Sequence, residues 1–354
     1  MIKLKTYYFI LYVTVVLQFS CIDKINVDVE SKSGSLVVNG QITDQEGPYE
    51  ILLYRSLGYF NYLEEVPDPV PGAKITIEDD LGSAIELEER RPGAYYTHSG
   101  FQGEVGRSYI LTIELNDGSV YKSNPERMPV NVGIDSLIAE YKVKTKVNKN
   151  NVPLDLTGFE IRIKTNPLND TDGFYRWRYN SIYEFRTFPE LRERPPGTIN
   201  PPPCAAGIVC TCCFCWTTES SSKVVVSDPE LVTDDLTDII DFIVNENSRF
   251  TFKYYIEVEQ LALTKSGHTF WDLVERQQNQ GSLFDQPSGK MPVNMYALSD
   301  ENEPIFGHFG VVSITKKDRF ILPKDLPVRS IQLDSIKEDC RLYKNSTNVR
   351  PSFW

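Results

Sequence analysis

The sequence has few histidines and lacks the motifs that identify common hydrolases and nucleotide-binding enzymes. Its three histidines, His98, His268 and His308, lie in separate segments, and no pair has the H-E-x-x-H spacing of a zinc site. There is no G-x-S-x-G nucleophile motif, no P-loop and no dinucleotide fingerprint. We therefore expect a protein that is not an enzyme and that needs no metal or cofactor.

Positive charge is also in short supply. The chain has 37 basic and 49 acidic residues, which gives a formal net charge of -12. This balance argues against nucleic acid as a partner and against electrostatic adhesion to anionic lipid. The 41% apolar content and the 19 tyrosines and 18 phenylalanines instead favour β-sheets with substantial cores.

Long apolar runs are absent after the first 20 residues. Near the start, two lysines precede the short apolar run 7–17, and Ser20 stands directly before Cys21. This order predicts a lipoprotein signal peptide over 1–20, lipidation of Cys21, and a polar tether over 21–35. The alternative is an ordinary cleavable signal in which the cysteine occurs by chance.

Residues 36–125 are predicted to form a small antiparallel sandwich of immunoglobulin or transthyretin type. Apolar and polar residues alternate in several segments, and the sequence Asn-Asp-Gly at 116–118 is typical of a hairpin turn. The predicted strands are 36–43, 49–55, 73–79, 84–87, 94–97, 109–115 and 120–123.

Residues 126–354 are predicted to form a larger β-rich domain with one amphipathic helix, so the fold class is mainly β. Thr264 or Ser266 can cap this helix and Gly281 can end it. His268 is expected on the surface and His308 in a loop. The predicted strands are 134–145, 159–165, 174–179, 223–227, 250–259 and 311–315.

One of these strands alternates aromatic and basic residues. Tyr175, Trp177 and Tyr179 share one face, and Arg176 and Arg178 share the other. The favoured interpretation is a strand whose aromatic face lies in the core. The alternative is an aromatic platform for a ligand.

Six cysteines besides Cys21 form a second pattern, and five of them lie close together after a proline-rich stretch. In an exported protein an even set of thiols is expected to form disulfides, which would staple a projecting loop. Two C-x-x-C spacings leave a zinc site or redox chemistry as weaker alternatives. The pairing is left open, with the last cysteine expected to clip the C-terminal segment to the cluster. The six are Cys204, Cys210, Cys212, Cys213, Cys215 and Cys340.

Other side chains carry weaker predictions. The aromatic residues Tyr59, Phe60 and Tyr62 are predicted to form a contact surface. The carboxylates Asp234, Asp235, Asp238 and Asp241 are predicted to be a solvated face or a helix N-terminus rather than a calcium or glycosidase site.

Several short segments in a specific order resemble those of a known family: 21–23, 36–43, 70–73, 93–96, 101–109, 175–177, 215–216, 270–271 and 351–354. In these segments the chain resembles a family of Bacteroidota lipoproteins described as domain of unknown function 4249. The resemblance implies a surface-exposed outer-membrane lipoprotein without established catalytic residues. It also implies a TonB-dependent outer-membrane barrel as partner.

The sequence therefore leaves three expected functions. The first is a non-enzymatic accessory that docks on a TonB-dependent transporter and assists ligand capture or complex stability. The second is a structural or adhesive envelope lipoprotein without a small ligand. The third and weakest is a hydrolase that uses the Asp234–Asp241 carboxylates and His308.

Overall fold

The computed structural model describes residues 34–56, 68–148, 150–165, 173–188, 213–228, 237–246, 249–279, 291–300, 302–327 and 339–354. Within these ranges the protein is mainly β, with one α-helix, α2 (Lys265–Asn279). None of the described helices is long and apolar enough to cross a membrane. Two short 3-10 helices are η3 (Pro323–Asp325) and η4 (Cys340–Leu342).

A single long sheet runs through the described part of the chain and contains eleven strands. Nine of them lie side by side in the order β20, β14, β13, β17, β19, β1, β2, β7 and β6. In that order they are Ser346–Thr347, Phe214–Ser220, Tyr175–Arg186, Tyr254–Ala262, Ile305–Ile321, Leu36–Thr43, Glu50–Arg55, Ala94–Tyr96 and Glu88–Arg91. The short strands β15 (Val225–Val226) and β3 (Asp68–Pro69) pair with β13 and β2.

Two smaller sheets complete the strands of the described ranges. The first follows the order β18, β9, β8, β4 and β5, with β10 paired to β8. These strands are Met295–Ala297, Val120–Ser123, Ser108–Glu114, Lys74–Asp79, Ala84–Glu86 and Glu126–Arg127. The second sheet contains β11 (Ile134–Val147), β12 (Pro153–Thr165) and β16 (Thr237–Val244).

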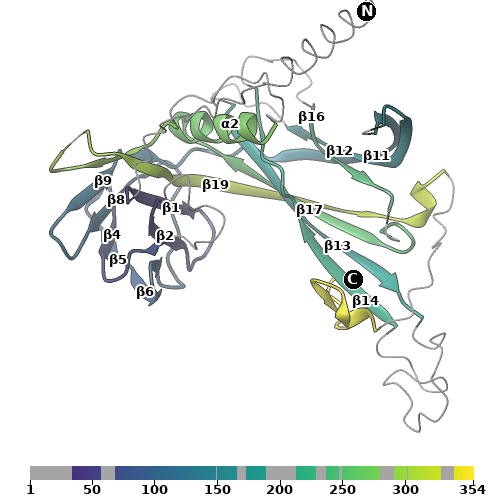
Figure 1. Ribbon diagram of the computed structural model, residues 1–354, viewed down its shortest axis with the longest axis horizontal. Coiled ribbons are helices and arrows are strands. Elements are labelled where there is room, and N and C mark those ends of the chain that lie inside the picture. The colour runs from purple at the N-terminus through teal and green to yellow at the C-terminus, as the bar shows by residue number, and fades with distance from the viewer. Residues whose placement is uncertain are drawn as a thin grey trace, which may run out of the picture.

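Strand β19 joins the two halves of the molecule, as Figure 1 shows by its course from the N-terminal strands to β17. Its first half pairs in parallel with β1, from Leu36 opposite Ile305 to Thr43 opposite Val312. Its second half pairs antiparallel with β17. Strands β18 and β19 therefore pair with the predicted N-terminal domain although they follow residue 126.

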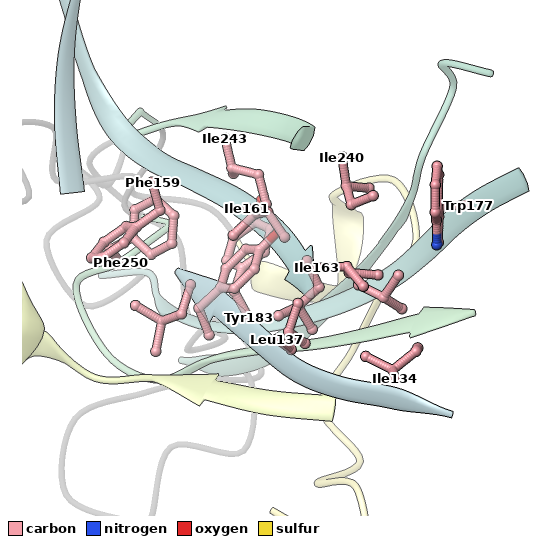
Figure 2. Close-up of a cluster of buried hydrophobic side chains, with 14 of the residues drawn as sticks. Ile134, Leu137, Phe159, Ile161, Ile163, Trp177, Tyr183, Ile240, Ile243 and Phe250 are labelled. Carbon is pink, nitrogen blue, oxygen red and sulfur yellow. The ribbon is translucent and has the colours of Figure 1, made fainter. Parts of the chain in front are cut away.

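Both small sheets pack on the same face of the long sheet. Along β19, Phe309 and Val311 lie in a core shared with β4, β8 and β9. Along β13, Tyr175 and Trp177 lie in a second core shared with β11, β12 and β16. Figure 2 shows the second core, with Ile161 of β12 and Ile243 of β16 in its middle and Trp177 of β13 at one end.

Helix α2 packs on the opposite face of the long sheet. Thr264 is its cap, because its Oγ1 accepts a hydrogen bond from the Gly267 N–H at 3.1 Å. Trp271 packs against buried Leu261, Leu263 and Val312, which alternate with the core residues of β17 and β19. The face of β13 that carries Arg176 therefore lies under the helix.

Two expectations about local structure are wrong. The segment of His308 is not a loop, because His308 lies in β19 opposite Asn39 of β1. The acidic run does not end in a helix N-terminus, because Asp238 and Asp241 lie in β16 and pair with Ile163 and Ile161 of β12. In both segments, pairing with a neighbouring strand overrides the weak local pattern of the sequence.

Candidate functional site

A hollow of about 320 Å³ opens between α2 and the outer face of the long sheet. It lies where the N-terminal strands meet the C-terminal strands through β19. Its lining combines cationic, amide and aromatic side chains from five different elements, a mixture found in ligand sites. The lining side chains include those of Asn39, Gln41, Glu50, Leu52, Arg176, Arg178, Phe270, Trp271 and His308.

Arg176 is the most unusual residue in this hollow. Within the described residues its side chain has neither a hydrogen bond nor an ion pair, and its Nε is buried without a partner. Its guanidinium carbon lies 3.5 Å from the ring centroid of Trp271, a cation–π contact that fixes the plane of the group. Burial, together with the neighbouring Arg178 cation, lowers the pKa of Arg176 to about 10. The group is therefore still a cation at neutral pH.

Arg178, two residues further along β13, has the partner that Arg176 lacks. Its Nε donates to Glu259 Oε2 at 2.6 Å, and Lys316 Nζ lies 2.7 Å from Glu259 Oε1. Burial alone would raise the pKa of Glu259, but Lys316 and Arg178 hold it below its usual value. Glu259 is thus committed to two cations and does not neutralise Arg176.

A buried polar cluster borders the hollow behind Phe270. The Glu126 carboxylate accepts hydrogen bonds from the Ser266 hydroxyl and from Asn294 Nδ2, the latter at 3.0 Å. His308 stacks on Phe270 at 5.0 Å between ring centroids. Burial lowers the pKa of His308 to about 4, against the opposing attraction of Glu126, so the ring is neutral at neutral pH.

Serine, histidine and a carboxylate meet in this cluster, but their order differs from that of a catalytic triad. In a triad the imidazole lies between the hydroxyl and the carboxylate. Here Ser266 donates directly to Glu126, and His308 Nε2 lies 3.4 Å from Ser266 Oγ. Asn294 also donates to the Phe309 carbonyl and accepts from its N–H, so the cluster fixes β10 and α2 to β19.

A larger hollow of about 760 Å³ lies on the other side of Ser266, between residues 124–130, Phe174 and the start of α2. Its two cations, Arg127 and Lys265, are both exposed, and Arg127 donates from Nε to the Gly106 carbonyl at 2.9 Å. Since its one buried carboxylate, Glu126, is satisfied by Ser266 and Asn294, this hollow offers no unpaired buried charge among the described residues.

The aromatic face of β13 lies in the core, as the favoured interpretation of the sequence has it. Tyr175 and Trp177 are buried in the core between the long sheet and the sheet of β11, β12 and β16. Tyr179 packs against the same core, and its hydroxyl donates to Asp241 at 2.8 Å. The face that opens to the hollow is the arginine face, with Arg176 and Arg178.

The described cysteines are bonded. Cys215 on β14 forms a disulfide with Cys340 in η4, which ties the C-terminal segment to the sheet. Cys213 is also disulfide-bonded. No group of three or more potential metal-ligating side chains occurs among the described residues.

Other predicted site residues lie outside the described ranges. These are Cys21, Tyr59, Phe60, Tyr62, Cys204, Cys210, Cys212, Asp234 and Asp235.

The remaining histidines lie away from the hollow. His98 is exposed. His268 is half-buried and not a plain surface residue, because its Nε2 donates to the Ser227 carbonyl at 2.8 Å and its ring packs on Phe174. The structure brings neither of them to His308.

The sequence places Arg176 on the non-aromatic face of its strand but does not assign it to a site, although a signal for such a role is present. An arginine within a strand whose other face is aromatic must lie on the outer side of the sheet. The sequence does not show that α2 packs over the outer face of β13. It also does not show that Glu259 forms its ion pair with Arg178.

The fold and the hollow define a mainly β protein with a partly enclosed cationic site beneath its helix. The chain belongs to the family described as Domain of unknown function (DUF4249), whose family model matches residues 22–318. A search of curated proteins found no match.

Proposed function

We propose that the protein is a non-enzymatic outer-membrane lipoprotein that docks on a TonB-dependent transporter and helps to capture its ligand. The observation that carries this proposal is the hollow under α2 with its unpaired cation, Arg176. Among the described residues this partly buried charge has no ion-pair partner, which is unfavourable for folding, so its presence is more readily explained by binding than by stability. Lipidation of Cys21 would hold the chain at the cell surface.

The test is recovery of the tagged native protein from membranes in mild detergent, followed by identification of its partners by mass spectrometry. We expect a TonB-dependent barrel in near-equal amount. The matched control is Cys21→Ser, which should appear in the soluble fraction without the barrel. Recovery of the wild-type protein alone would contradict the accessory role.

A structural or adhesive role is the second candidate, and one observation favours it. The hairpin of β11 and β12 carries apolar side chains that are more than half exposed: Val143, Val147, Val152 and Leu154. If this role is correct, replacing these four residues by serine should weaken surface attachment and leave recovery of any barrel unchanged.

A further inference from the structure

The charge balance around the hollow favours an anion. Arg176 has no carboxylate partner in the described chain, and its charged neighbour is Arg178, itself a cation. Glu50 also lines the hollow, but it accepts hydrogen bonds from the Tyr96 hydroxyl and from Arg91, the latter at 2.6 Å. No carboxylate of the described residues therefore compensates the positive charge of Arg176.

The position of Arg176 leaves its donors available. Trp271 covers one face of the guanidinium, and this stacking restricts the rotation of the long side chain. The donors of a guanidinium lie in its plane and match the two oxygens of a carboxylate or phosphate. The stacked guanidinium of Arg176 is therefore preorganised. It can bind an oxyanion along the edge of its plane with little further loss of side-chain entropy.

The rest of the lining fits a small organic molecule. The side chains of Asn39 and Gln41 make no hydrogen bond within the described residues, which leaves both amides available to a ligand. Phe270 and Leu52 supply apolar surface, and the His308 ring is neutral and adds no charge of its own. A volume of about 320 Å³ is at the small end of ligand sites.

We propose that this hollow binds a small organic anion whose carboxylate or phosphate group pairs with Arg176. The inference rests on the proposed role in ligand capture and names the chemical class of that ligand. Arg176 supplies charge and orientation, Asn39 and Gln41 bind polar groups, and Phe270 contacts the apolar part.

The experiment is isothermal titration of the purified full-length protein in detergent with succinate, benzoate and inorganic phosphate as separate probes. We expect saturable binding of at least one probe. Arg176→Met should weaken it by about tenfold or more, the usual effect of losing a charged hydrogen-bonding partner. Binding of succinate or benzoate identifies a carboxylate ligand, and binding of phosphate alone identifies a phosphate ligand.

The control variant is Arg276→Met on the exposed side of α2, the helix that covers Arg176; there Arg276 pairs with Asp272 at 2.9 Å. It should bind as the wild type does. A second readout separates binding from folding: without ligand, Arg176→Met should melt at the same temperature as the wild type or higher. No saturable binding of any probe, or unchanged binding by Arg176→Met, would overturn the inference.

This experiment contains no barrel, so its outcome is separate from that of the accessory role. Anion binding without barrel recovery would uphold the inference and contradict the accessory role. Barrel recovery with no anion binding would contradict the inference and uphold the accessory role. Arg176→Met should still recover the barrel, because Arg176 acts on the ligand.

Discussion

At the scale of single residues, Gln260 shows how a buried amide can be completely satisfied. Its Oε1 accepts hydrogen bonds from Trp177 Nε1 and Thr165 Oγ1, both at 3.0 Å. Its Nε2 donates to Asn131 Oδ1 at 3.1 Å and to the Val132 carbonyl at 2.9 Å. One side chain thereby joins β17 to β13, to β12 and to the segment before β11.

We expect Gln260→Leu to lower the free energy of unfolding by about 3 kcal/mol or more, because it leaves several buried donors and acceptors without partners. Chemical denaturation measures this loss. Gln278→Leu is the control. The exposed Gln278 accepts a hydrogen bond from the Val224 N–H at 2.9 Å and donates a long one to the Ser222 carbonyl at 3.4 Å, and its loss should be about 1 kcal/mol or less. Equal losses in both variants would contradict the role assigned to Gln260.

His308 predicts a dependence of stability on pH. Its pKa is about 4 in the folded protein, whereas an unfolded histidine has a pKa near 6.5. The unfolded chain therefore binds the proton more readily, and stability should fall as the pH drops from about 6.5 to about 4. The expected contribution of His308 across this window is about 3 kcal/mol.

The measurement is the free energy of unfolding across this pH range for the wild type and for His308→Gln. The variant should lose the contribution of His308 and show a shallower decline. His98→Gln changes an exposed histidine and should follow the wild-type curve. If the two variants decline in parallel with the wild type, His308 is not the responsible group.

Single residues also show where sequence reasoning ends. The alternation in β13 correctly assigns Tyr175 and Trp177 to the core. It cannot assign a function to Arg176, because that depends on Trp271 and Glu259, which are distant in sequence. Which of two arginines pairs with a carboxylate that is distant in sequence is not encoded in any local sequence pattern.

At the scale of elements, apolar alternation correctly predicts the longer strands of the N-terminal region and misses the two-residue strands β3 and β10. The pattern fails at β6, whose four residues are all charged and exposed. This strand lies at the edge of the long sheet, where charged residues discourage pairing with other chains. Its main-chain pairing with β7 is what defines it as a strand.

Gly307 is the critical position of β19. Its φ is +91°, and a Cβ added there would lie 1.8 Å from the Val38 carbonyl oxygen. We expect Gly307→Ala to lower the free energy of unfolding by about 3 kcal/mol or more, or to prevent folding, because backbone would have to move. Circular dichroism and thermal denaturation measure the effect.

The control is Gly310→Ala in the same strand. There an added Cβ would lie 3.2 Å from Cγ of the Gln41 side chain, which can move. Its loss should be about 1 kcal/mol or less. A tolerated Gly307→Ala would show that the β1–β19 pairing adapts more easily than the structure indicates.

At the scale of the whole molecule, the disulfide between Cys215 and Cys340 closes a loop with a sequence separation of 125. Removing it by the double change Cys215→Ala and Cys340→Ala should lower the free energy of unfolding by about 2–5 kcal/mol. The C-terminal packing should loosen as well, because Trp354 Nε1 donates to Glu184 and its ring packs near Phe320.

Urea denaturation under non-reducing conditions tests this expectation. Ser346→Ala is the control. It removes the neighbouring 2.7 Å hydrogen bond to Thr217 and a long, exposed one to the Lys344 carbonyl at 3.5 Å, and it should lose about 1 kcal/mol or less. A double variant as stable as the wild type would show that packing alone holds the C-terminal segment.

The pairing of β1 with β19 has a consequence for biosynthesis. Leu36 lies opposite Ile305, so the first described strand to be synthesised pairs on one side with nearly the last described strand. Until then that edge of β1 is open, and an open edge in an incomplete chain invites pairing with the wrong strand. Nascent chains that stop before residue 305 should therefore be the most prone to aggregate and the most dependent on chaperones.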